Sequence, residues 1–211
     1  MPLPATDAFA GRGNNPLANS ANWTTSGAQD CQTRDTNDIA GDNNGSGTSL
    51  THWSADSFAD DHSSEFVVTS VVTSTDWIGP GVRLQGGAKS GYVYWMRSTD
   101  SQLRRFDAGS QTAIGGTGEG YAATDVIYLE ISSTTLDPKK NGATDANIGT
   151  QTDATYSSGS AGVGALDNSN NNRIDDFTGD DLGAAPGRTT FNTDPRPLGM
   201  FAGVSRGFNA P

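Results

Sequence analysis

The stretch that decides the fold runs Ala161-Gly162-Val163-Gly164-Ala165-Leu166, crosses a polar Asn/Ser segment and resumes as Arg173-Ile174-Asp175-Asp176-Phe177. This pattern predicts a strand, a tight turn and a closing strand whose carboxylates face solvent or a partner strand. It is the clearest indication of a fold in the chain. No stretch elsewhere indicates a catalytic reaction with comparable clarity.

The composition of the 211 residues points to the same architecture. Glycine occurs 27 times and proline 9 times, while hydrophobic residues make up only 33% of the chain. Such a composition suits many short strands joined by turns better than a helical bundle. We therefore predict an all-β protein, and the length is enough for one domain with a sizeable core.

Runs rich in β-branched and aromatic residues recur through the middle of the chain, each bounded by turn residues. Their spacing is typical of a sandwich. The predicted strands are 48–53, 65–72, 77–84, 91–97, 102–106 and 126–131. Residues 26–47 are expected to form loops or short edge strands, Gly79-Pro80-Gly81 a bulge or bend, and Asn141-Gly142 a hairpin turn.

The charge of the chain excludes some classes of partner. Its 24 acidic and 13 basic residues give a net charge of −11. A strongly negative surface repels phosphate backbones and anionic membranes, so we expect no nucleic-acid or membrane partner. Cys31 is the single cysteine, which excludes an intrachain disulfide and a thiolate zinc cluster. Because the segment after Met1 lacks the pattern of a secretory signal, we expect a soluble chain that such a signal does not export.

The order of several short motifs resembles the laminin-G-like, concanavalin A-like domains of bacterial and phage surface proteins. The resemblance covers about residues 7 to 182. It implies a jelly-roll sandwich of two curved antiparallel sheets whose first and last strands are neighbours. The motifs, in chain order, are Asp7-Ala8-Phe9, Asn22-Trp23-Thr24, Gly81-Val82-Arg83-Leu84, Gly91-Tyr92, Tyr128-Leu129-Glu130-Ile131, Asn141-Gly142, the segment 152–159, Gly162-Val163-Gly164 and Ile174-Asp175-Asp176-Phe177.

The fold pattern ends near Leu182. We therefore predict a jelly-roll β-sandwich domain over residues 1–182 and an extended C-terminal arm over 183–211. The arm is rich in large apolar residues, and each one left exposed would forgo roughly 1.5–3 kcal/mol of burial. We expect these residues to bind the domain or a neighbouring subunit; they are Phe191, Leu198, Met200, Phe201 and Phe208.

Candidate catalytic residues are few. Glu130 lacks the paired carboxylate that a glycoside hydrolase of this fold would carry. The two histidines, His52 and His62, have no His-x-x-x-His spacing, and no Gly-x-Ser-x-Gly motif occurs. The sequence therefore indicates a protein that is not an enzyme.

Oxygen-rich loops make calcium the more serious metal candidate. They lie at 56–61, 167–171 and Asp175-Asp176. None has the ligand spacing of an EF-hand, so the sequence leaves structural calcium open without assigning a residue to it.

Aromatic side chains are the predicted route to sugar binding, because a flat ring stacks on the apolar face of a pyranose. The candidates are Trp53, Trp77, Tyr94 and Trp95. Along residues 92–97, Tyr92, Tyr94 and Met96 share one face of the strand, so Trp95 faces the opposite way.

Two functions follow as hypotheses. The first is a non-enzymatic structural protein on the surface of a phage particle, such as a capsid decoration protein, held by other virion proteins or by copies of itself. The alternative is a carbohydrate-binding module that mediates adhesion to glycans, located on the virion, outside the cell or at the cell surface.

Overall fold

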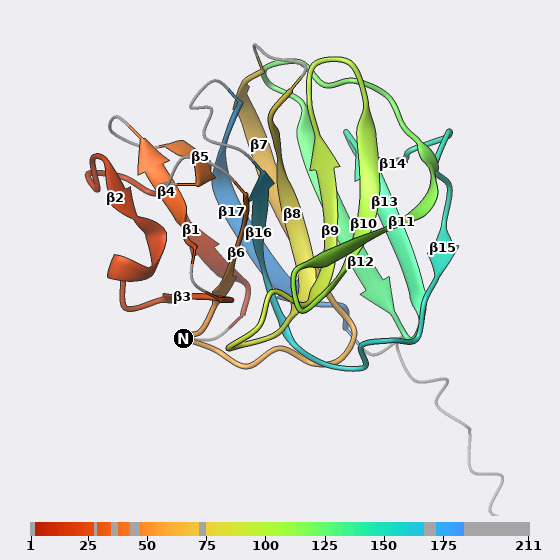
Figure 1. Cartoon of the computed structure of the whole chain (residues 1–211), viewed down its shortest axis with the longest axis horizontal. Helices are drawn as coiled ribbons and strands as arrows, with labels where there is room; N and C mark the ends of the chain where they lie inside the picture. The colour runs from red at the N-terminus through yellow and green to blue at the C-terminus, as the bar shows by residue number, and fades with distance from the viewer. Residues whose placement is uncertain are drawn as a thin grey trace, which may run out of the picture.

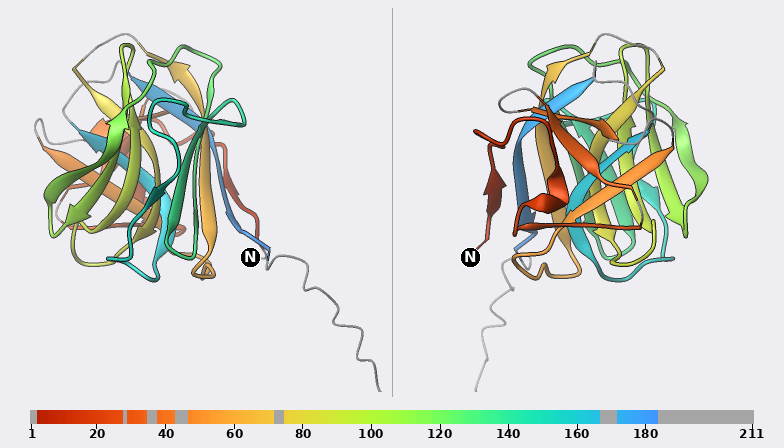
Figure 2. Two further views of the ribbon diagram at one scale, coloured as in Figure 1. Left: turned by 90° about the vertical axis from the view of Figure 1, so that its right-hand side faces the viewer. Right: turned by 60° about the vertical axis from the view of Figure 1, so that its left-hand side comes forward.

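The β-rich runs of the sequence form strands in two antiparallel sheets that lie one against the other (Figures 1 and 2). The computed structural model describes residues 3–27, 29–34, 38–42, 47–71, 75–166 and 172–183. Both the all-β class and the jelly-roll sandwich predicted from the sequence are confirmed.

Among the described residues, one sheet has ten strands, in the order β14-β13-β12-β7-β17-β5-β4-β2, with β1 also paired to β17 and β15 to β13. Its strands are β1 (Ala5–Asp7), β2 (Asn15–Pro16), β4 (Cys31–Arg34), β5 (Asp38–Asp42), β7 (His62–Ser70), β12 (Val126–Ser132), β13 (Thr135–Lys140), β14 (Ala143–Thr144), β15 (Gln151–Thr152) and β17 (Arg173–Asp181). The pairing of β1 with β17 places the first and last strands side by side, as the resemblance implied.

The other sheet has seven strands within the described part of the chain, in the order β11-β10-β9-β8-β16-β6-β3. They are β3 (Trp23–Thr25), β6 (Thr48–Trp53), β8 (Trp77–Leu84), β9 (Gly91–Met96), β10 (Ser101–Asp107), β11 (Ser110–Thr117) and β16 (Ser160–Leu166). The helical element among the described residues, η1 (Leu17–Asn19), is a 3-10 turn of three residues, so no helix there is long enough to cross a bilayer.

The main core lies between the sheets and contains a cluster of aromatic rings. The Trp23 ring centroid is 4.7 Å from that of Phe177 and 5.3 Å from that of Trp53, and Phe66 joins from β7 at 5.2 Å from Phe177. All four side chains are at most 2% exposed. Because aromatic rings bury large areas, this cluster ties strands from both sheets together.

The two strands that decided the fold class do not form a hairpin, which corrects the prediction. β16 pairs with β6 and β8 in the seven-stranded sheet, whereas β17 pairs with β1, β5 and β7 in the ten-stranded sheet. The chain therefore passes from one sheet to the other between them. Their inward residues, such as Val163 and Phe177, meet in the core rather than across a ladder.

The predicted turn at Asn141-Gly142 is confirmed. Both residues have positive φ, 52° and 81°, and Lys140 pairs with Ala143 across them. Positive φ at both central positions is the geometry that Asn-Gly favours in two-residue hairpin loops. The Asn141 side chain strengthens the turn by accepting a hydrogen bond from the Val126 N–H at 2.8 Å.

Candidate functional site

The four aromatic residues predicted to stack on sugars are all buried, so their prediction as a binding platform is wrong for this conformation. Trp53 and Tyr94 are 0% exposed, Trp95 is 1% exposed and Trp77 is 8% exposed. A ring that stacks on a sugar must present one face to solvent. None of the four does so.

The prediction that alternate residues along β9 face opposite sides of the sheet is nevertheless confirmed. Tyr92, Tyr94 and Met96 face the main core, while Val93 and Trp95 face the opposite side of the seven-stranded sheet. There they join a second apolar group, which we call the outer-face cluster: Leu50, Trp77, Leu84, Val93, Trp95 and Phe106, with Leu166 beside it.

Polar contacts cross the outer-face cluster and help to close it. The Gln111 side chain of β11 donates a hydrogen bond to the Thr48 hydroxyl of β6 at 3.0 Å, although four strands separate β11 from β6 in the sheet order. Lys89, in the β8–β9 connection, donates to the Thr48 carbonyl and to Gln29. The Arg97 guanidinium lies 4.2 Å from the Trp77 ring centroid. These long-range contacts occupy the face on which sugar stacking was expected.

The predicted arm residues lie outside the described part of the chain, as do residues 167–171 of one calcium candidate. The arm residues are Phe191, Leu198, Met200, Phe201 and Phe208. Their role in binding a partner stays a prediction.

The residues weighed for catalysis take structural positions. Nδ1 of His52 lies 2.9 Å from the hydroxyl oxygen of Ser26, which is 0% exposed. Glu130 forms an ion pair with Lys139 at 2.9 Å and accepts a hydrogen bond from the Tyr128 hydroxyl. Within the described ranges, no three His, Cys, Asp or Glu residues come together as a metal-binding group.

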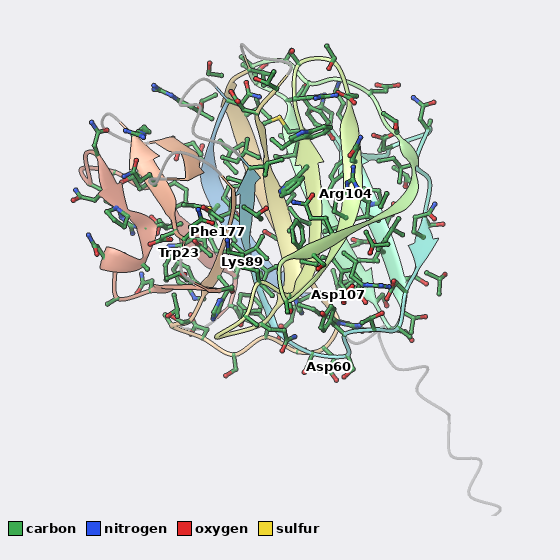
Figure 3. All side chains as sticks on the ribbon, in the orientation of Figure 1. Trp23, Asp60, Lys89, Arg104, Asp107 and Phe177 are labelled. Carbon is green, nitrogen blue, oxygen red and sulfur yellow. The ribbon has the colours of Figure 1, made fainter. Side chains whose placement is uncertain are left out.

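A polar cavity of about 340 Å³ opens at the end of the sandwich where Asp60 lies (Figure 3). Three connections meet there: the segment before β7, the two-residue β12–β13 turn, and the loop between β15 and β16. We call it the Arg83 cavity; its lining is Asp60, Asp61, Arg83, Ser133, Thr134, Ala154, Tyr156 and Ser157.

Arg83 holds the three connections in place. Its buried guanidinium donates hydrogen bonds to the carbonyl oxygens of Asp60 at 2.9 and 3.0 Å, of Ser133 at 2.7 Å and of Tyr156 at 2.7 Å. Asp61 adds an ion pair at 3.6 Å. A buried charge is tolerated when its donors are paired, so Arg83 organises the cavity wall rather than offering its charge to a ligand.

The backbone of Arg83 is itself unusual for a residue other than glycine, with φ of 49°. At two positions, glycine allows a neighbouring segment to approach the Arg83 backbone closely. A Cβ atom on Gly91 would lie 2.6 Å from the Arg83 carbonyl oxygen, and one on Gly159 would lie 2.5 Å from its carbonyl carbon. Glycines at both positions therefore leave room for the Arg83 conformation.

A second set of hydrogen bonds, partly buried, fixes the loop that carries Tyr156. The Tyr92 hydroxyl donates to Asp153 at 2.8 Å and accepts from the Tyr156 N–H at 3.1 Å. Burial raises the pKa of Asp153, but bonds from Thr155, Tyr92 and Arg105 outweigh that effect and lower it to about 2. Asp153 therefore stays charged at neutral pH, and its ion pair with Arg105 at 2.7 Å holds the loop.

The groups left for a ligand are mostly acceptors and hydroxyls. The Asp60 carboxylate is exposed and makes no hydrogen bond to another described residue, and the hydroxyls of Thr134 and Ser157 are likewise unbonded within those residues. Asp61 accepts hydrogen bonds from the Ser133 N–H at 2.7 Å and the Ser132 hydroxyl at 3.1 Å. Tyr156 is half-buried, and its ring adds an apolar wall.

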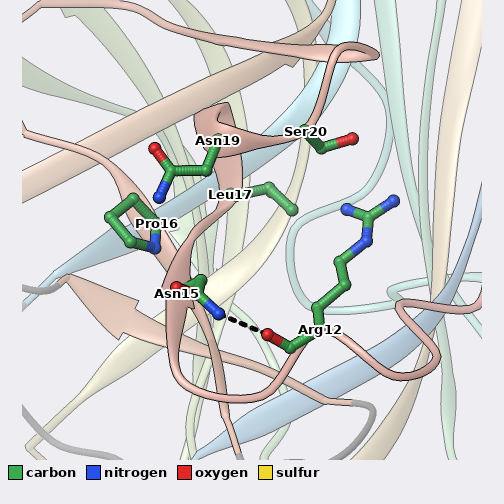
Figure 4. A pocket seen from close by; sticks show the side chains of 6 residues that line it. All are labelled: Arg12, Asn15, Pro16, Leu17, Asn19 and Ser20. Atoms are coloured by element: carbon green, nitrogen blue, oxygen red, sulfur yellow. Dashed lines mark hydrogen bonds between the residues drawn. The ribbon is translucent and has the colours of Figure 1, made fainter.

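A second cavity, of about 270 Å³, lies beside η1 (Figure 4). Its lining is Arg12, Asn15, Pro16, Leu17, Asn19 and Ser20. Arg12 is held by Asp7 at 2.6 Å, while its buried Nη1 has no hydrogen-bond partner. This lining includes neither an aromatic ring nor a carboxylate. The Arg83 cavity has both, so we take it as the candidate ligand site.

Sequence reasoning did not find the Arg83 cavity. The sequence presents Asp60 and Asp61 only as part of an oxygen-rich loop, and Tyr156 only within the segment 152–159 of the resemblance. One sequence signal was available, since Arg83 interrupts an otherwise apolar strand. Its partners are three carbonyl groups from distant connections, which no side-chain pattern reveals.

Comparison with known proteins agrees with the fold. No family model and no curated protein matches the sequence. The carbohydrate-binding module CBM66 from Bacillus subtilis has a TM-score of 0.56 and 17% identity over 77% of this chain and 97% of its own. The VIP36 exoplasmic/lumenal domain, in a form bound to Ca²⁺ and Man3GlcNAc, has a TM-score of 0.55 and 10% identity over 83% of this chain and 93% of its own.

A protein of unknown function with a galectin-like fold, also from Bacillus subtilis, has a TM-score of 0.53 and 12% identity over 83% of this chain and 98% of its own. At such low identity these similarities concern the fold alone. They agree with the concanavalin A-like part of the resemblance.

Proposed function

We propose that this protein is a carbohydrate-binding domain without catalytic activity, and that the Arg83 cavity holds a short neutral saccharide. One observation carries the proposal: a free carboxylate, unbonded hydroxyls and a half-buried tyrosine ring line a single cavity of about 340 Å³. Sugars are recognised by such a combination, in which acceptors bind hydroxyl groups and a ring packs on the C–H face.

The charge of the cavity favours neutral sugars. Asp60 and Asp61 contribute two carboxylates, and the Arg83 guanidinium is directed to carbonyl groups of the protein. A uronate or sulfate group would meet these carboxylates in a chain of net charge −11. We therefore expect weaker binding of acidic saccharides.

The fold comparison supports the same function from another direction. One protein of this fold is described as a carbohydrate-binding module, and another was solved with Man3GlcNAc. The low identity transfers no site from them, so the choice of the Arg83 cavity depends on its own chemistry.

The cavity carboxylates support binding rather than cleavage. Glycoside hydrolysis needs two carboxyl groups, one of which must act as a proton donor from a sheltered environment. Asp60 is exposed to water, and both oxygens of Asp61 accept hydrogen bonds, one from the end of β12 and one from the β12–β13 turn.

The test begins with a glycan array and continues with calorimetric titration of the saccharides that bind. Asp60→Ala removes a charged acceptor, and hydrogen bonds to charged groups contribute about 1.5–3 kcal/mol, so we expect about a 10- to 100-fold loss of affinity. Glu119→Ala, which removes an exposed carboxylate at another cavity, is the matched control and should bind normally. An array without a binder, or unchanged affinity in Asp60→Ala, would contradict the proposal.

We also propose, as a second function, that the domain is a surface component of a virus particle attached through residues 184–211. The support is the sequence alone, because the apolar residues of this segment suit an attachment arm. The two functions are compatible, since a surface protein of a particle can bind glycans.

A further inference from the structure

His62, at the start of β7, lies directly behind the Arg83 cavity and contacts Arg83 through the backbone. Its Nδ1 is 2.7 Å from the Ala59 carbonyl oxygen, and its Nε2 is 3.0 Å from the Arg83 amide nitrogen. A carbonyl only accepts and an amide N–H only donates. These two partners therefore require the neutral tautomer with the proton on Nδ1 and a bare Nε2.

This hydrogen bond satisfies a backbone group that has few alternatives. Arg83 is 2% exposed and His62 is 0% exposed, so water does not replace either partner. A buried N–H without an acceptor costs about 1–3 kcal/mol. His62 thus stabilises the left-handed Arg83 backbone, from which the guanidinium reaches the three connections of the cavity.

Protonation of His62 would place a hydrogen on Nε2, facing the Arg83 N–H. The two donors would repel, and the bond that holds Arg83 would be lost. The groups around the ring are the Phe58 ring at 5.4 Å, the Arg83 backbone and guanidinium, and the carboxylates of Asp60 and Asp181.

These surroundings keep the ring neutral. Burial lowers the pKa of His62 from its ordinary value of 6.5, and the Arg83 charge lowers it further. The Ala59 bond and the charges of Asp181 and Asp60 act in the opposite direction without reversing the shift. Acid is therefore needed to charge the ring, and charging it opposes the folded arrangement.

We propose that His62 is the positioning residue of the Arg83 cavity and that its protonation releases the bound saccharide. The release rests on the proposed function, whereas the positioning of the cavity loops by His62 does not. In the neutral ring, His62 Nε2 accepts the hydrogen bond from the Arg83 N–H. After protonation, Nε2 carries a hydrogen itself and faces the Arg83 N–H as a second donor.

The positioning is tested on the protein alone by NMR of ¹⁵N-histidine together with backbone amides. The chain has two histidines, and His52→Gln assigns both signals. We expect His62 in the Nδ1–H tautomer, and we expect the amides of Asp60, Ser133 and Tyr156 to shift with the midpoint of the His62 titration. The opposite tautomer, or loop amides that do not follow His62, would overturn the inference.

The release is tested by titrating a saccharide bound by the wild type at pH 7.5 and pH 5, with amide spectra confirming that the protein remains folded at both. We expect a lower affinity at pH 5 than at pH 7.5, because charging His62 removes the acceptor of the Arg83 N–H. Below the His62 midpoint measured by NMR, the affinity should fall by up to a factor of ten for each pH unit. His62→Gln should bind with an affinity that does not change over this range, and His52→Gln should keep the loss.

The outcomes separate the two proposals. A wild type that binds no saccharide at any pH contradicts the proposed function, and the NMR result still decides the role of His62. A wild type whose affinity is equal at both pH values, or a His62→Gln variant that keeps the loss, overturns the release. If His62→Gln does not fold, His62→Asn serves in its place.

Discussion

At Gly79, strands β8 and β9 approach so closely that a Cβ atom would lie 2.0 Å from the backbone carbonyl oxygen of Tyr94. The next residue, Pro80, stands within the same central strand and lies opposite Val163 of β16. A proline there contributes no N–H to a ladder. The sequence predicts a bulge or bend at Gly79-Pro80-Gly81, but the register of β8 against β16 is continuous across these three residues. The register shifts just after them, between Gly81, which pairs with Gly162, and Leu84, which pairs with Ser160.

Gly79→Ala should destabilise the protein strongly. The added methyl group meets backbone that cannot rotate away, so we expect a loss of about 2–3 kcal/mol in the free energy of unfolding, measured by urea denaturation. Gly86→Ala is the control, because the nearest atom to its Cβ would be His52 Cε1 at 3.9 Å. Equal stability of the two variants would show that β8 and β9 are farther apart than described.

At the scale of elements, the β10–β11 hairpin and the β8–β9 connection help to cover the outer face of the seven-stranded sheet. Trp95 packs against Phe106 at 5.1 Å and stacks with Trp77 at 6.3 Å between ring centroids. Gly164 leaves room beneath, since a Cβ there would lie 2.9 Å from Trp95 Nε1. The face is a small second core.

Trp95 should therefore matter for stability and not for sugar binding. Trp95→Ala is expected to lower the free energy of unfolding by about 3–5 kcal/mol, as for other buried aromatic residues, with Trp95→Phe losing less. Because Trp95→Phe keeps a packed ring, its saccharide affinity should equal that of the wild type. A stable Trp95→Phe protein that no longer binds saccharide would restore the original prediction of a stacking platform.

At the scale of the whole molecule, the last described strand of the sandwich is β17. β17 ends at Asp181, and β1 and β7 flank it in the sheet. The Leu182 N–H donates to the Asp61 carbonyl at 2.9 Å, which ties the end of the described fold to the Arg83 cavity.

Removal of residues 184–211 should leave the thermal unfolding midpoint of the domain nearly unchanged. The same deletion should abolish association with virus particles, measured by co-sedimentation, if the arm is the attachment segment. Particles that carry the truncated protein at wild-type levels would contradict the arm's role. A large fall in the midpoint would instead show that the arm packs on the domain.

The sequence by itself determined the all-β class, most strand positions and the facing of residues along β9, because strand periodicity is a local property. It did not predict β11 (Ser110–Thr117), because all of its residues except Ile114 are polar or small and exposed, so they carry no alternation. It also assigned the wrong partners to β16 and β17, since a strand pattern does not specify which sheet a strand joins.

Only the tertiary structure decided where the candidate site lies and whether the aromatic residues predicted to bind sugar are exposed or buried. The Arg83 cavity depends on backbone carbonyls that come from three separate connections, and backbone groups are the same in every sequence. The burial of Trp95 depends on contacts such as Gln111 with Thr48, which are 63 residues apart. Local patterns give the direction of a side chain, whereas its exposure depends on what the rest of the chain places over it.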